Sequence, residues 1–186
     1  FGDVLLTARG QYHWSCVERM HRLRLVQDFP VALDGEVLLR YHAEGVAFKL
    51  RPYRSTETRD ELLKRFEIVK ALAGKLWLWI ESLRLGHTFA TPCDYALNAT
   101  DKCPETSALR NQLVNARAFG LRRIVSHDSC RYPRQRLFHA LSLLLWESHT
   151  LTQQSLLIQV QEELFTARSD FAGLVKAYER MWHRFN

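Results

Sequence analysis

The sequence predicts a mostly α-helical protein with one small β-hairpin, an α+β fold with about five to six helices around a long central helix. Three observations predict it: a helical period over residues 58–85, a period of two over 36–53, and further helical patterns over 104–186. The 186 residues, 47% of them hydrophobic and few of them glycine or proline, favour a single domain, residues 1–186. We expect the hairpin and the central helix to form its nucleus, with the helical C-terminal part packed on them.

The central helix is predicted by apolar residues spaced alternately four and three positions apart. These residues are Leu62, Phe66, Val69, Ala73, Leu76, Ile80 and Leu83. Thr58 and Glu61 have the spacing of a capping box at the start, and Gly86 suits the left-handed end. Residues 76–80 are apolar on every side, which predicts that Trp79 is buried. The same spacing fits an intermolecular coiled coil, so a homodimer is an alternative use of this helix.

The hairpin is predicted by alternation of apolar and polar residues in 36–42 and again in 46–51, on either side of the Gly-containing segment 43–45. One face of the hairpin would be apolar and would pack on the helices. The other face would present the basic side chains Arg40, His42, Lys49 and Arg51.

Other helices are predicted over 11–28, from Pro104 to Gly120, and over 135–148. Two more follow, the first capped by Thr150 with Gln153 and the second capped by Ser169. These elements complete the mostly helical prediction.

The chain is basic, with a net charge of +6 and a pI of about 9.4. Nucleic acid, acidic lipid and acidic protein are all compatible partners of such a surface. No apolar run approaches the roughly 18 residues of a membrane span, and no secretory signal is visible. We therefore expect a cytoplasmic protein that does not enter a membrane.

The cysteines are too few and too scattered for a disulfide scaffold, and reduced thiols are the first expectation. They are Cys16, Cys93, Cys103 and Cys130. One alternative is a Cys93–Cys103 bridge around the glycosylation sequon 98–100, as in a secreted protein. Another is a zinc site: His13 with Cys16 and His127 with Cys130 share an H-x-x-C spacing, and Cys93 and Cys103 supply further thiolates. The candidate group is Cys93, Cys103, His127 and Cys130. Since no paired CxxC motif is present, we expect no metal and no other cofactor.

A basic segment provides the main candidate binding residues. Six arginines lie within twenty residues, opposed only by Asp128 and interleaved with Tyr132: Arg117, Arg122, Arg123, Arg131, Arg134 and Arg136. Arginine binds phosphate with two parallel hydrogen bonds and stacks on bases, so the segment predicts a nucleic-acid-binding surface. The alternative is structural, because arginines also bind helix ends and distant acids.

Residues 46–52, VAFKLRP, followed by a helix, resemble the start of the ribbon-helix-helix family of DNA-binding proteins. The resemblance covers residues 46–86. It implies a two-stranded ribbon in the major groove of duplex DNA, formed by a dimer, with Lys49 and Arg51 as base-reading side chains.

Catalytic motifs are absent: the sequence has no nucleophile elbow, phosphate loop or metalloprotease motif. His139 and His149 lie on or beside the predicted helix from Gln135, where a histidine is more often a core or surface residue than a catalytic base. Glu162 and Glu163 lie on a predicted helix without a partner of matching spacing. The sequence therefore predicts a non-enzymatic nucleic-acid-binding protein without a small-molecule substrate, such as a DNA-binding regulator or assembly factor of a mobile element or virus. The alternative is a structural or protein–protein interaction module whose basic surface binds an acidic partner.

Overall fold

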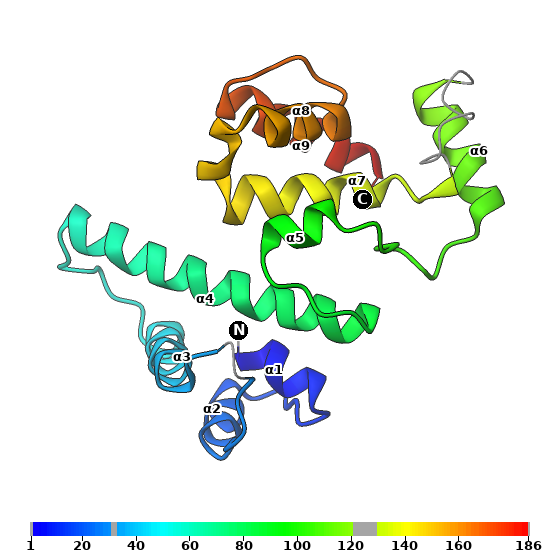
Figure 1. Ribbon diagram of the computed structural model, residues 1–186. Coiled ribbons are helices and arrows are strands. Elements are labelled where there is room, and N and C mark those ends of the chain that lie inside the picture. Colours follow the sequence, from blue (N-terminus) through cyan, green and yellow to red (C-terminus); the bar gives the residue numbers. More distant parts are fainter. Residues whose placement is uncertain (1, 31–32, 121–129, 186) are drawn as a thin grey trace. The chain divides into compact units, whose positions relative to one another are not determined.

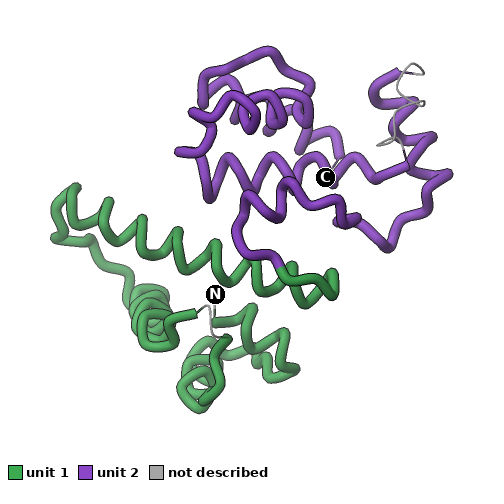
Figure 2. Tube along the Cα trace, viewed as in Figure 1, with its two compact units in different colours: residues 1–88 green, residues 89–186 purple. Residues whose placement is uncertain are grey.

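The computed structural model describes residues 2–30, 33–120 and 130–185 (Figure 1). Every regular element in these ranges is helical. The predicted α+β fold is therefore wrong, and the described chain is all-α. It forms two compact units, residues 1–88 (unit 1) and 89–186 (unit 2), shown in Figure 2.

Helix α3 (Gly35–Leu50) occupies the place of the predicted hairpin. Asp34 caps it, because its carboxylate accepts a hydrogen bond of 3.1 Å from the Val37 N–H. Leu38 and Val46, the buried residues of α3, are eight positions apart and so lie on one face of a helix. A short alternation of apolar and polar residues is compatible with a strand and with a helix. In α3 the N-terminal cap and the buried face are those of a helix.

Unit 1 contains three short helices and one long one: α1 (Gly2–Ala8), α2 (Cys16–Arg24), α3 and α4 (Arg59–Leu85). Helices α1, α2 and α3 pack against one another. Their core joins Leu5, Leu6 and Leu23 to Leu38, and the middle of α4 adds Leu72 and Leu76. This small apolar cluster holds the four helices together.

Helix α4 begins and ends where the sequence predicts. Thr58 Oγ1 accepts from the Glu61 N–H at 3.3 Å, and the Glu61 carboxylate accepts from the Thr58 N–H at 2.7 Å. Gly86 ends the helix at φ 61°. The helix is not a central one, however: Leu62 is exposed, and Trp79 is only partly buried, contrary to the prediction. Neither α4 nor any other described helix has the length and apolarity to cross a membrane.

Unit 2 is built from short helices around a second core. The helices are α5 (Pro92–Leu97), α6 (Ala108–Phe119), α7 (Arg134–Leu141), α8 (Gln154–Leu164) and α9 (Phe171–Phe185). A π turn, η3 (Ser142–Trp146), and a 3-10 turn, η4 (Ser148–Thr152), connect α7 to α8. Helices α7, α8 and α9 contact one another and bury Leu137, Leu143, Val160, Leu174 and Met181.

Two predicted caps in unit 2 differ from the structure. Thr150 lies within η4, and α8 starts after Gln153 without a side-chain cap. At the start of α9 the capping side chain is that of Asp170, the residue after Ser169, because Asp170 Oδ1 accepts a hydrogen bond from the Gly173 N–H at 2.7 Å. Ser, Thr and Asp have similar capping preferences, so the backbone geometry decides which of them caps the helix.

The unit 1 core predicts a sharp contrast along α4. Leu76 is 2% exposed, whereas Leu83 on the same helix is 59% exposed. Leu76→Ala should lower the free energy of unfolding by about 2–5 kcal/mol, because it leaves a cavity. Leu83→Ala should change it by less than about 0.5 kcal/mol. Urea unfolding monitored by circular dichroism measures both, and equal losses would contradict this position of α4.

Candidate interaction site

A cavity of about 620 Å³ opens in unit 1 between α3 and α4, and we call it the α3–α4 groove. Leu38, Val46 and Phe48 of α3 form one apolar wall, and Leu62 and Val69 of α4 form the other. Leu62 and Val69 are seven residues apart, which places them on one face of α4. The volume lies in the range typical of ligand-binding clefts.

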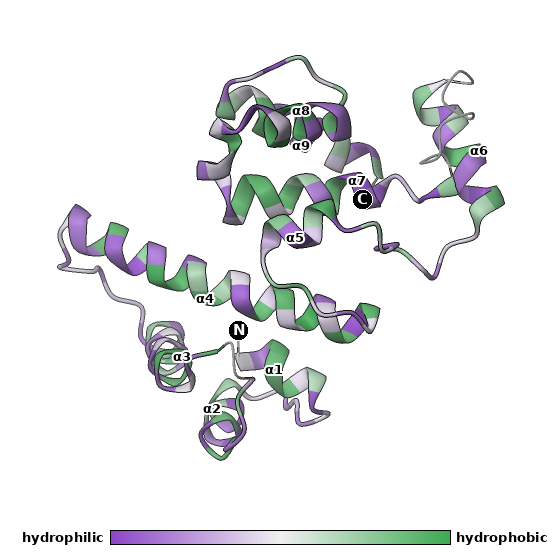
Figure 3. Cartoon of the chain, viewed as in Figure 1, coloured by the Kyte–Doolittle hydropathy of each residue, from purple (hydrophilic) through white to green (hydrophobic). Residues whose placement is uncertain are grey.

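Apolar side chains at the groove are exposed to solvent. Of the residues that line it, Phe48 is 49% exposed, Leu62 is 44% exposed, and Tyr53 is exposed as well. Leu63 and Phe66 of α4, which do not line the groove, are also exposed. Figure 3 shows hydrophobic residues along the whole of α4, including its first turns. Contiguous apolar side chains bordered by polar ones mark interaction sites on protein surfaces.

Arg65 of α4 spans the groove toward α3 and the α3–α4 connection. Its guanidinium binds Glu44 at 3.1 Å and Glu57 at 2.7 Å, and it lies 5.9 Å from the centre of the Tyr41 ring. These carboxylates are about one-third exposed, so each ion pair contributes little to stability. The network instead holds the Glu44 and Glu57 carboxylates on the Arg65 guanidinium.

The floor of the groove includes a buried arginine. Arg19 of α2 donates to Asp3 at 2.6 Å and to the carbonyl oxygens of His13 and Trp14 at 2.6 and 2.7 Å. The guanidinium is almost fully buried, so it holds α1 against the loop before α2. In the sequence Arg19 looks like its neighbours Arg22 and Arg24 on the same helix. Only the fold shows that Arg19 is the buried one.

His42 of α3 also lines the groove. Burial lowers the pKa of its imidazole; Arg19 acts in the same direction, and Asp3 opposes it. The His42 Nε2 atom is buried without a hydrogen-bond partner among the described residues. Burial therefore favours the neutral form of this imidazole.

A set of exposed cations borders the groove and its α3–α4 connection, and the structure gives none of them an ion-pair partner among the described residues. They are Lys49, Arg51, Arg54, Arg59 and Lys64, and we call them the basic rim. Lys49 and Arg51 are predicted site residues. They lie at the C-terminal end of α3 instead of on a strand of the predicted hairpin.

The other three rim residues were missed by sequence reasoning. The signal for Arg54 is its place in residues 48–54, FKLRPYR, where two aromatic residues lie among three basic ones. Between residues 47 and 65 the sequence has six basic and three acidic residues, a net charge of +3 (six minus three).

The predicted arginines of unit 2 differ in their contacts. Arg131 donates to the Ala99 carbonyl at 2.9 Å, and Arg134 donates to the Phe185 carbonyl at 3.2 Å. Arg136 binds Glu163 at 3.1 Å. Arg117 is exposed in the last turn of α6. Arg122 and Arg123 lie outside the described residues. The other four arginines belong to unit 2, whereas Lys49 and Arg51 belong to unit 1.

All four cysteines lie in the described ranges, and the structure contains them as thiols and not as disulfides. His127 of the suggested zinc site lies outside those ranges. The described histidine, cysteine and acidic side chains nowhere gather in threes with the geometry of a metal site.

No protein-family model, curated protein or solved structure matches the chain. The groove and the basic rim therefore have to be interpreted from their own chemistry.

The burial of His42 predicts a pH dependence of stability. Its folded pKa is below its unfolded value of about 6.5, so protons bind the unfolded chain more readily. The free energy of unfolding should fall as the pH drops from about 6.5 through the folded pKa. An NMR titration of the His42 ring, with urea unfolding across the same pH range, measures both effects. His42→Gln should weaken the dependence, and a midpoint at or above 6.5 would contradict the burial.

Proposed function

We propose that unit 1 is a protein-interaction module whose α3–α4 groove binds an amphipathic helix bearing acidic residues beside its apolar face. The observation that carries the proposal is the exposed apolar lining of the groove next to cations that have no ion-pair partner among the described residues. Phe48 and Leu62 supply the apolar contacts, and the basic rim supplies the charge. The proposal corresponds to the interaction module with an acidic partner that the sequence offers as its alternative function.

The apolar part of the groove favours a protein partner over nucleic acid. Phe48 and Leu62 of its lining are exposed, and an aliphatic side chain such as Leu62 makes neither hydrogen bonds nor ion pairs with a base or a phosphate. Aromatic and aliphatic side chains of a partner would displace water from them, the main gain in protein association.

The secondary structure of unit 1 favours a helix as the bound element. Its described residues contain no strand, so no sheet edge is offered to an extended peptide. Two helices instead form the walls of the groove, and an amphipathic helix can place residues at i, i+3, i+4 and i+7 between such walls.

Charge favours acidic flanks on that helix. Glu44 and Glu57 are held by Arg65, whereas Lys49 and the other rim residues have no ion-pair partner among the described residues. The positive charge of the basic rim would attract an acidic partner and repel a basic one.

A pair of peptides tests the proposal. The intact chain is titrated into two fluorescent amphipathic helical peptides that share one apolar stripe, flanked by glutamates in one and by lysines in the other. We expect the acidic peptide to bind at least about tenfold more tightly, measured by fluorescence anisotropy. Leu62→Asp should weaken it by about tenfold or more, because it places a charge in the apolar wall.

Leu83→Asp is the matched control, since Leu83 is exposed on the same helix and does not line the groove. It should leave the affinity within about twofold. Equal binding of both peptides, or equal loss in both variants, would reject the proposal. If sedimentation shows a dimer that Leu62→Asp dissociates, the groove is occupied by a second copy and the proposed partner is wrong.

A second candidate function is nucleic-acid binding, the leading prediction from the sequence. The observation that favours it is the exposed run from Phe48 to Arg54, in which two aromatic residues alternate with three cations. Surfaces that bind single strands combine these side chains, with aromatic rings stacking on bases and cations contacting phosphates.

Mobility shifts at two salt concentrations test this second candidate. If it holds, the double variant Lys49→Glu, Arg51→Glu should reduce the salt slope by about 1 for each lost phosphate contact. The double variant Arg24→Glu, Lys75→Glu changes the charge equally at two exposed positions of unit 1 outside the groove. It should change the slope less. Absence of binding at low salt would argue against a nucleic-acid surface. So would a salt slope that Leu62→Asp lowers as much as the double variant Lys49→Glu, Arg51→Glu does.

A further inference from the structure

A pocket of about 440 Å³ lies in unit 2, lined by residues from the ends of α6 and α8 and from the second half of α9. Its volume is in the range of clefts that bind small molecules. Most of the lining is apolar and comes from Phe119, Leu164, Phe165, Ala177, Met181 and Phe185. The pocket therefore offers an apolar ligand a place to leave water.

Three aromatic rings, one from the end of each helix, form the wall of this pocket. The centre of the Phe119 ring lies 4.5 Å from that of Phe165 and 5.5 Å from that of Phe185. All three rings are only partly buried. Among the described residues, Phe165 is the one residue other than glycine with a left-handed φ, 51°. This conformation is unfavourable for a bulky side chain, so the fold keeps the ring in the wall at a cost in free energy.

Two cations complete the lining, Arg180 and Arg184 of α9, and we call them the pocket arginines. They are four residues apart and so lie on one face of the helix. Both are exposed, and neither has an ion-pair partner among the described residues. The Arg184 guanidinium lies over the rings of Phe119 and Phe185, 5.6 and 5.7 Å from their centres. A contact with a ring face does not neutralise the charge of a guanidinium.

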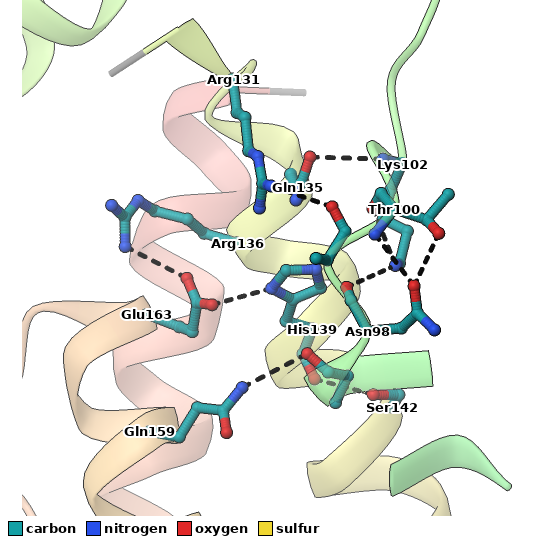
Figure 4. A network of polar contacts seen from close by, with 12 residues as sticks. Asn98, Thr100, Lys102, Arg131, Gln135, Arg136, His139, Ser142, Gln159 and Glu163 are labelled. Atoms are coloured by element: carbon teal, nitrogen blue, oxygen red, sulfur yellow. Dashed lines mark hydrogen bonds and ion pairs between the residues drawn. The ribbon is translucent and has the colours of Figure 1, made fainter. Parts of the chain in front are cut away.

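Two other arginines of unit 2 show the contrast, because their groups are already bound within the chain. Arg136 binds Glu163 at 3.1 Å, and the same carboxylate faces His139 (Figure 4). Arg131 donates to a backbone carbonyl at 2.9 Å. No carboxylate lies among the described residues that line the pocket, so the charge of the pocket arginines is not balanced there.

We propose that this pocket binds an amphipathic anion, an aliphatic chain that ends in a carboxylate or phosphate group. The chain packs among the aromatic rings and displaces water from them. The oxyanion accepts hydrogen bonds from the pocket arginines, whose planar N–H groups match both headgroups. The described lining has no other polar side chain to bind the edge of a base or the hydroxyls of a sugar. The site lies in unit 2 and does not depend on the proposed function of unit 1.

Methyl NMR on the intact chain tests the site, because its two methionines lie in different units. Met181 lines the pocket, and Met20 of α2 serves as the internal control. The chain, labelled with ¹³C at the methionine methyl groups, is titrated separately with sodium decanoate and sodium decyl phosphate below micelle-forming concentrations. We expect the Met181 signal to shift saturably with at least one of them while Met20 stays unmoved. The anion that saturates at the lower concentration identifies the headgroup.

Two further ligands separate the contribution of the chain from that of the charge. Decyltrimethylammonium has the same chain with a positive headgroup, and acetate has the negative charge without the chain. Each lacks one of the two proposed contacts, so each should bind at least about tenfold more weakly than the preferred anion.

The variant Arg180→Glu reverses one charge at an exposed side chain that makes no described hydrogen bond or ion pair. It should weaken binding of the preferred anion at least about tenfold and strengthen binding of decyltrimethylammonium. The control Arg110→Glu makes the same change at an exposed position of α6 outside the pocket. It should leave both affinities within about twofold.

Four outcomes would overturn the proposal. The first is no saturable shift of Met181 in the parent chain. The second is equal affinity for the anionic and cationic amphiphiles, which leaves an apolar surface without selectivity. The third is unchanged anion binding in folded Arg180→Glu, which places the headgroup elsewhere. The fourth is a dimer in sedimentation that the anion dissociates, which assigns the pocket to a second copy. The parent titrations alone decide the question if the variant does not fold.

Discussion

Charge-assisted hydrogen bonds from two buried cations to backbone carbonyls fix one loop in each unit of this protein. Arg19 in unit 1 binds the carbonyls of His13 and Trp14, and Lys102 in unit 2 binds those of Asn98 and Thr100 at 3.0 and 2.9 Å. A buried charge is stable only where hydrogen-bond partners surround it, so each cation determines the backbone conformation of the loop that it binds. The floor of the α3–α4 groove depends on the first contact set. The orientation of the Gln135 amide depends on the Lys102 loop.

The two small cores explain why so much apolar surface stays in solvent. Each unit has fewer than 100 residues, and chains of that size bury a smaller fraction of their surface than larger domains. In unit 1 the core takes Leu72 and Leu76 from the middle of α4 and leaves its first turns, with Leu62 and Phe66, uncovered. The groove is a consequence of this partial packing. A partner that covers it would gain the burial that the unit cannot supply by itself.

The candidate sites were only partly predictable. The basic character of Lys49 and Arg51 is visible in the sequence, and both are exposed. Pairings such as His139 with Glu163 were not visible, because the two residues are 24 positions apart on different helices. The same is true of Arg131 and Arg134, whose partners are backbone carbonyls that carry no sequence signal. An arginine-rich segment thus has the same composition whether its side chains bind phosphate or tie the chain to itself.

Local interactions are what the sequence by itself determined. The capping box of Thr58 with Glu61 and the stop at Gly86 involve neighbours along the chain, and both are found as predicted. Of the predicted apolar stripe, Leu76 is buried, whereas Leu62, Phe66 and Leu83 are exposed. Tertiary packing decided the rest. The alternation in 36–53 fits a strand or a helix, and α3 forms because its N-terminal cap and its buried face, Leu38 and Val46, suit a helix packed on α1 and α2. The partial burial of Trp79 has the same origin, since burial depends on which distant surfaces are available and not on the residue's own neighbours.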